Sequence, residues 1–203
     1  MDTWVWIVTG VVVAIVVLGV LASVLRTRQS RSLRDRFGRE YDRTVDKAGG
    51  RREAEQELRM REKRHDELDL RPLSPDARER YLRQWQVTQG RFVDDPTGAV
   101  SEADDLVQQV MRERGYPVDD FERRAADVSV EHPELVEKYR TADGIARASE
   151  RGEASTEDLR HSVRHYRALF VELLEVADDA EDASTRDRQV DEVRAHDNVE
   201  RLR

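Results

Sequence analysis

Hydrophobic positions along the chain form two kinds of pattern. Residues 4–25 make one uncharged apolar run in which Thr9 and Ser23 are the polar side chains. A run longer than about 18 residues without charge is long enough to cross the hydrocarbon core of a bilayer as a helix. We therefore predict a transmembrane helix over residues 4–25. Beyond this run, apolar residues recur every three or four positions, which indicates amphipathic helices.

The segment that follows the apolar run is predicted to be helical and strongly charged. An apolar stripe of Leu33, Phe37, Tyr41 and Val45 recurs every four residues up to the Gly49-Gly50 pair. Residues 51–68 carry few apolar positions, so we expect a mostly solvated spacer helix or a weak coiled coil there. The basic stretch within it, residues 59–65, is interpreted as a solvated face with intrahelical ion pairs. Residues 26–73 are thus expected to be a basic juxtamembrane and charged helical spacer.

From residue 74 onward, helix caps alternate with apolar stripes. The expected helix starts are Ser74-Pro75, Asp95-Pro96, Asp119 or Asp120, His132-Pro133 and a capping box at Ser155 to Asp158. Gly115 and Gly152 are expected to end helices. Strand-like alternation is missing, so residues 74–176 are predicted to form a small helical domain of four or five helices. The acidic tail over residues 177–203 is expected to be disordered. The predicted fold class is all-α.

Charges around the apolar run predict its orientation. Six arginines and one aspartate lie between residues 26 and 39, whereas the three residues before the run hold only an aspartate. Basic residues beside a span stay on the cytoplasmic side, so we expect the N-terminus outside and the rest in the cytoplasm. The same residues favour contact with anionic lipid headgroups, and they are Arg26, Arg28, Arg31, Arg34 and Arg36. Trp4 and Trp6 fit the outer membrane interface.

Two alternatives to a plain anchor stay open. A cleaved signal peptide would place residues 26–203 outside the membrane, but the first residues are acidic and the apolar core is long for such a peptide. The run also holds two small-xxx-small pairs, which begin at Gly10 and Gly19. The nine-residue step between the pairs is about 900°, so they lie on opposite helix faces, which weakens a dimer interface.

Composition narrows the classes of function. Of 203 residues 38% are charged, the formal net charge is −8, and cysteine is absent. Because the positive charge is concentrated next to the apolar run, the remainder is acidic, which disfavours a nucleic-acid-binding surface. The lack of cysteine agrees with a cytoplasmic domain.

Three stretches resemble sequences of a known kind. They are LRDRFGREYD at residues 33–42, RFVDDP at residues 91–96 and MRERGYPVDDF at residues 111–121. Over most of residues 33–175 the chain resembles a family of uncharacterised single-pass membrane or secreted bacterial proteins, mainly actinobacterial. This resemblance implies a bacterial envelope protein. It implies no activity, and no functional residue comes from it.

The candidate metal ligands are His161 and His165, with Glu157 one turn earlier. Their i, i+4 spacing places two imidazoles side by side on a helix, as a metal pair requires. Both histidines lie nearly opposite the apolar stripe of their helix, and the set of donors is incomplete. We interpret them as a solvated pair, with a metal-dependent enzyme or sensor as the alternative.

Other polar and aromatic groups are interpreted as structural. The doublets Asp94-Asp95 and Asp119-Asp120 stand at helix starts, and Asp104-Asp105 is placed on a polar helix face. Most aromatic residues fall on apolar stripes. Tyr116 is the expected exposed exception, and we expect it either to anchor a partner or to pack against the end of its helix. No phosphate-binding glycine loop or nucleophile motif is present in the sequence.

These patterns together predict a membrane-anchored helical module without enzymatic activity. We expect its partners to be membrane lipids and another protein, and we expect no cofactor, nucleic acid or small-molecule substrate. An exported envelope protein is the further alternative.

Overall fold

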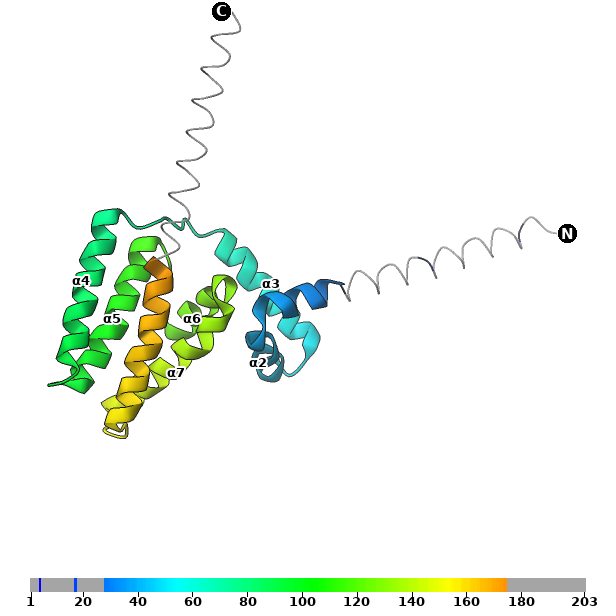
Figure 1. The fold of residues 1–203 in the computed structure, drawn as a ribbon. Coiled ribbons are helices and arrows are strands. Elements are labelled where there is room, and N and C mark those ends of the chain that lie inside the picture. Colours follow the sequence, from blue (N-terminus) through cyan, green and yellow to red (C-terminus); the bar gives the residue numbers. More distant parts are fainter. Residues whose placement is uncertain (1–3, 5–16, 18–27, 175–203) are drawn as a thin grey trace, which may run out of the picture. The chain divides into compact units, whose positions relative to one another are not determined.

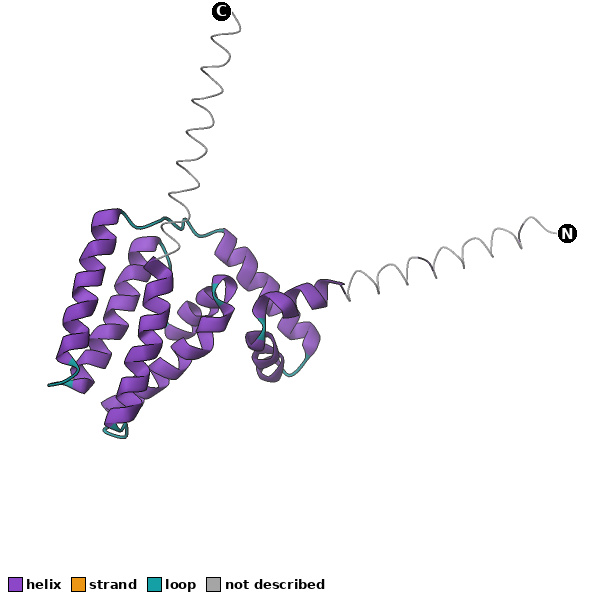
Figure 2. Ribbon diagram, in the orientation of Figure 1, coloured by secondary structure: helices purple, strands orange, loops and turns teal. Residues whose placement is uncertain are grey.

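The computed structural model describes Trp4, Val17 and residues 28–174, and the regular structure among them is helical throughout (Figures 1 and 2). The helices are residues 28–37, α2 (Arg39–Ala48), α3 (Arg51–Asp66), α4 (Pro75–Arg91), α5 (Pro96–Arg114), α6 (Phe121–Glu131), α7 (Pro133–Glu150) and residues 156–174. Strands are absent from this part of the chain, so the all-α prediction is confirmed.

Across the described residues, no helix combines the length and apolarity that crossing a bilayer requires. Apart from Trp4 and Val17, the run over residues 4–25 lies outside the described residues, and so does the tail over residues 177–203. The transmembrane helix and the disordered tail therefore stay predictions.

The chain divides into two compact units, Met1–Lys63 and Arg64–Arg203. In the first unit, the helix over residues 28–37 is followed by α2 and by most of α3 (Figure 1). Its small apolar interior consists of Leu33, Phe37, Tyr41, Ala54 and Leu58, all buried. We call the described part of this unit, residues 28–63, the juxtamembrane unit, after the predicted span that precedes it in the sequence.

Two expectations for the juxtamembrane unit are corrected by the structure. The apolar stripe from Leu33 to Val45 belongs to two helices, because Gly38 adopts a φ of 50° and ends the first. Helix α3 is also less solvated than expected, since Leu58 and Arg61 are buried. Its buried apolar side chains are Ala54 and Leu58, whereas Met60 is 53% exposed, so even a sparse stripe contributes to the interior.

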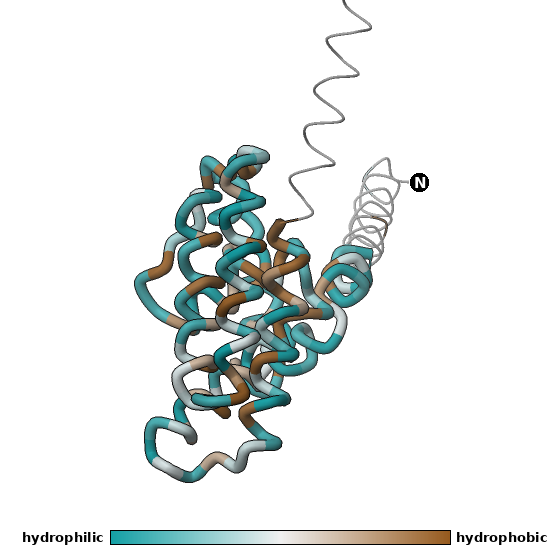
Figure 3. Tube along the Cα trace, turned by 60° about the vertical axis from the view of Figure 1, so that its left-hand side comes forward, coloured by the Kyte–Doolittle hydropathy of each residue, from teal (hydrophilic) through white to brown (hydrophobic). Residues whose placement is uncertain are grey.

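The second unit contains five helices within residues 74–174, as the sequence predicted. Helix α4 packs along α5, α6 packs along α7, and α5 also contacts α7. Apolar positions recur between polar ones along the helices (Figure 3). In the core, the rings of Trp85 and Phe170 stack with their centroids 4.7 Å apart, and Tyr139 meets Tyr166 edge-on at 6.2 Å.

The predicted helix caps of this unit are present. Ser74 Oγ accepts a hydrogen bond from the Ala77 amide at 3.2 Å, and Asp95 Oδ1 accepts one from the Gly98 amide at 2.9 Å. Asp120, rather than Asp119, caps α6. Ser155 and Asp158 form a reciprocal capping box before the last helix. Local sequence thus determines where these helices begin.

Gly115 ends α5 and also permits a close approach of two backbone segments. Its φ is 96°, a value that favours glycine. A Cβ atom at this position would lie 2.4 Å from the Asp69 carbonyl oxygen. The same segment is tied to the end of α5 by a hydrogen bond from the Arg71 amide to the Arg114 carbonyl at 3.0 Å.

Candidate functional site

A groove between α4 and α5 is the candidate binding site of the second unit. It encloses about 430 Å³, which lies within the range of protein ligand pockets, about 300–1,000 Å³. The residues that line it are Arg83, Gln84, Val87, Thr88, Arg91, Glu102, Asp105, Leu106 and Gln109. Val87 is 64% exposed, because it projects from α4 away from the buried stripe of Tyr81 and Trp85. An exposed apolar side chain thus lies in a shallow groove whose other lining side chains, apart from Leu106, are polar or charged.

The two walls of this groove carry opposite charges. Helix α4 supplies Arg83 and Arg91, and α5 supplies Glu102 and Asp105. Arg91 forms an ion pair with Glu102 across the groove, and the Thr88 hydroxyl donates to the same carboxylate at 3.3 Å. These contacts hold the walls together while Val87 stays uncovered. The arrangement suits an apolar side chain flanked by charges of both signs.

A second polar cluster contains two histidines that are not among the predicted metal ligands. His65 Nε2 lies 3.6 Å from Glu131 Oε1, and His132 Nε2 lies 3.6 Å from Glu131 Oε2. Both distances are too long for hydrogen bonds, although both imidazoles are buried. His132 Nδ1 faces Glu172 at 3.4 Å. Nevertheless, no group of three or more His, Cys, Asp or Glu side chains within the described ranges is arranged to hold a metal ion.

Tyr116 belongs to this histidine cluster, and its predicted exposure is wrong. It is 3% exposed, because its ring packs 6.2 Å from His65 and under the guanidinium of Arg114. Its hydroxyl donates a short hydrogen bond to Glu131. Burial and the neighbouring carboxylate both raise the pKa of Tyr116, so it stays protonated. The residue fastens the end of α5 to α6.

Asp104 is also placed differently from its prediction. It was expected on a polar face, but it is half-buried, and desolvation raises the pKa of its carboxyl group. Gln108 donates to it at 2.6 Å, whereas its Oδ1 atom has no hydrogen-bond partner. Arg124 provides a compensating charge nearby and itself donates to the Tyr139 hydroxyl at 3.0 Å. Burial raises the pKa of Tyr139 to about 12.

The predicted metal ligands lie on the surface of the helix over residues 156–174. The rings of His161 and His165 are 6.2 Å apart, and His161 Nε2 lies 3.5 Å from Glu157. Glu157 also pairs with Arg160 and Arg164, so its carboxylate is shared among cations. Partial burial and the proximity of His161 lower the pKa of His165.

The basic residues predicted to contact lipid headgroups are all exposed where the structure describes them, and two of them also form ion pairs. Arg28 and Arg31 are exposed. Arg34 pairs with Asp42 at 3.1 Å, and Arg36 pairs with Glu62 at 3.0 Å. Arg26 and Trp6 lie outside the described residues, and Trp4 is exposed.

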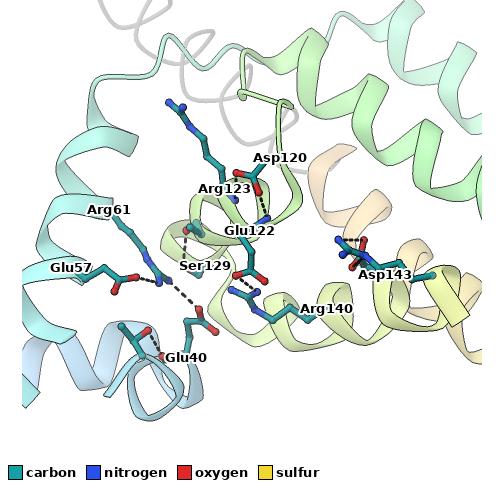
Figure 4. A network of polar contacts seen from close by, with 12 residues as sticks. Glu40, Glu57, Arg61, Asp120, Glu122, Arg123, Ser129, Arg140 and Asp143 are labelled. Carbon is teal, nitrogen blue, oxygen red and sulfur yellow. Dashed lines mark hydrogen bonds and ion pairs between the residues drawn. The ribbon is translucent and has the colours of Figure 1, made fainter. Parts of the chain in front are cut away.

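One residue of the basic stretch over residues 59–65, Arg61, forms a buried ion pair. Arg61 Nη1 donates to Glu40 Oε1 at 3.0 Å, and its other terminal nitrogen contacts Glu57 on the same helix (Figure 4). Arg61 is 5% exposed and Glu40 is 4% exposed. The expected solvated face is thus wrong at Arg61, because a tertiary partner on α2 lies against it.

No protein-family model, no curated protein and no solved structure matches the chain. The resemblance to the actinobacterial envelope family therefore stays a prediction, and the function is argued from the residues alone.

Proposed function

We propose that this chain is a membrane-anchored helical module that binds another protein and has no enzymatic activity. The anchor is the apolar run over residues 4–25, with the N-terminus outside and the helical units in the cytoplasm. The exposed Arg28 and Arg31 directly after that run support this orientation, because cationic side chains beside a span are retained inside.

The groove between α4 and α5 carries the binding role in this proposal. Val87 is exposed between two oppositely charged walls. An amphipathic helix of the partner fits such a groove, with one apolar side chain on Val87 and Leu106. Acidic residues on one side of that helix would face Arg83, and basic residues on its other side would face Asp105. Charge complementarity of this kind fixes register and orientation more than it adds affinity.

Site-specific photo-cross-linking in native cells tests the binding role. A photoreactive phenylalanine analogue at Val87 is expected to trap one discrete partner on the full chain. The matched control is the same analogue at Val93, which is 83% exposed but does not line the groove. Equal cross-linking from both positions, or none from Val87, would contradict the proposal.

The anchor and its orientation are tested separately. In spheroplasts, a tag at the C-terminus is expected to stay intact under external protease, and carbonate washing is expected to leave the chain in the membrane fraction. A digested tag would place the helical units outside the membrane, and an extracted chain would remove the anchor.

A further inference from the structure

The juxtamembrane unit contains a basic cleft that the sequence patterns did not reveal. The cleft encloses about 440 Å³ and is lined by Gln29, Ser30, Arg51, Arg52, Glu55 and Arg59. Three guanidinium groups and one carboxylate give this lining a net positive charge. We propose that this cleft binds the phosphate of an anionic phospholipid headgroup, and this inference rests on the proposed anchor.

The single carboxylate of the cleft is already held by its neighbours. Glu55 Oε1 accepts hydrogen bonds from the Ser30 hydroxyl at 2.5 Å and from the Tyr41 hydroxyl at 3.0 Å. Its Oε2 atom accepts from Arg59 at 3.4 Å. The Glu55 carboxylate is therefore held in place by these hydrogen bonds. Its single negative charge offsets only part of the positive charge of the three arginines.

The arginines keep donors for a further anion. A guanidinium has five N–H donors in a planar fork that matches phosphate oxygens. Arg51 uses Nε to donate to the Tyr41 hydroxyl at 2.9 Å, and Arg59 uses one terminal nitrogen on Glu55. The side chains of Arg51 and Arg59 are about half exposed, and Arg52 is exposed as well. The cleft also lies at the start of α3, where the helix dipole favours negative charge.

Position along the chain selects a lipid as the source of the phosphate. Gln29 and Ser30 follow the end of the proposed span at Leu25 by four and five residues. Since a chain spans at most about 3.3–3.6 Å per residue, the rim of the cleft lies no more than about 18 Å from the hydrocarbon boundary. The headgroup layer of one leaflet is about 5–8 Å thick. A phosphate at this depth belongs to the inner leaflet.

Native mass spectrometry of the full chain in a nonionic detergent tests the cleft. The probes are equimolar phosphatidylglycerol and phosphatidylcholine, and inorganic phosphate in a separate arm. The wild-type chain is expected to retain phosphatidylglycerol preferentially. Replacing Arg51, Arg52 and Arg59 together by Gln is expected to lower that preference about tenfold or more, because each arginine near an anionic surface contributes a factor of about five.

Three further samples make the result decisive. The control variant replaces the exposed Arg43, Lys63 and Arg64 by Gln, removes the same charge and is expected to keep the preference. Glu55→Gln removes the one carboxylate and is expected to strengthen phosphatidylglycerol binding. The triple Arg→Lys variant of the cleft keeps its charge and is expected to bind better than the triple Gln variant, which separates lost binding from lost folding.

Several outcomes would overturn the proposal. Equal losses in the cleft and control variants would show general charge attraction in place of a site. Equal binding of inorganic phosphate would make the ligand a soluble anion and remove the lipid as its source. Carbonate extraction of the same variants reports the anchor independently: a chain that stays in the membrane but shows no lipid preference refutes the cleft alone.

Discussion

The buried ion pair of the juxtamembrane unit makes the sharpest test of how this unit is stabilised. Glu40→Gln removes the charge that lies 3.0 Å from Arg61 Nη1. Both side chains are almost completely buried, so the guanidinium keeps its desolvation cost and loses an opposite charge. Removing one partner of a buried pair typically costs about 3–5 kcal/mol. Arg61→Met is expected to cost a similar amount, because the buried Glu40 carboxylate then loses the guanidinium that lies 3.0 Å away.

The double variant Glu40→Leu with Arg61→Met gives the contrasting result. Replacing both partners by apolar side chains of similar size removes both desolvation costs, and such replacements are often neutral or stabilising. We therefore expect the double variant to lie close to the wild-type chain in stability. With Glu40→Leu as the matching single variant, the coupling between the two sites is then the measured quantity, since neither single change isolates it.

Hydrogen exchange of the full chain in detergent measures the stability of the juxtamembrane unit separately from that of the second unit. A loss of about 3 kcal/mol lowers amide protection by about 100-fold, and it is expected in peptides from residues 28–63. Peptides from residues 75–174 serve as the internal control and should keep their protection. Unchanged protection after Glu40→Gln, or a double variant as weak as the sum of the single ones, would refute the reasoning.

Three further predictions concern the second unit and use thermal or denaturant unfolding of the full chain. Asp104→Asn is expected to stabilise the chain by about 0.5–2 kcal/mol at neutral pH, because burial raises the pKa of the folded carboxyl. The gain should shrink as the pH falls through that raised pKa and should vanish below the ordinary pKa of 3.8, where the carboxyl is protonated in both states; a gain that grows on acidification would contradict this. Gly115→Ala is expected to destabilise by about 1–3 kcal/mol from backbone strain alone, with further loss from the contact with the Asp69 carbonyl, whereas Gly144→Ala meets open space and should not destabilise. Ser155→Ala should cost about 1 kcal/mol through loss of the capping box, and an unchanged midpoint would show that the cap contributes nothing.

The local signals of this sequence predicted the second unit well. Ser74, Asp95 and Asp120 cap helices because their side-chain oxygens reach amides two or three residues ahead, a geometry that needs no distant partner. The apolar stripes likewise define the buried faces, since a 3.6-residue period places those side chains together in any helical packing. Helix starts therefore follow from the sequence, and the five helices observed lie within the predicted four or five.

The features that sequence reasoning missed depend on distant partners. His65 is distant in sequence from Glu131, the residue that directly precedes His132, and only the fold brings the His65 imidazole to 3.6 Å from the Glu131 carboxylate. Arg61 looks like a solvated side chain until Glu40 is placed against it. Helical spacing alone does not distinguish a polar residue on a wet face from one facing another helix. Val87 did carry a signal, because it is an apolar residue outside the stripe of its own helix.

The lipid-binding cleft and the partner-binding groove lie in separate compact units, which makes the two proposals independent in experiment. The cleft is built from residues 29–59, and the groove from residues 83–109. Sites without shared contacts have additive effects, so the cleft triple variant should lower phosphatidylglycerol binding without changing the cross-link at Val87. Coupling between the two readouts would mean that lipid binding changes the second unit. That result would make the module a membrane-responsive adaptor in place of a simple tether.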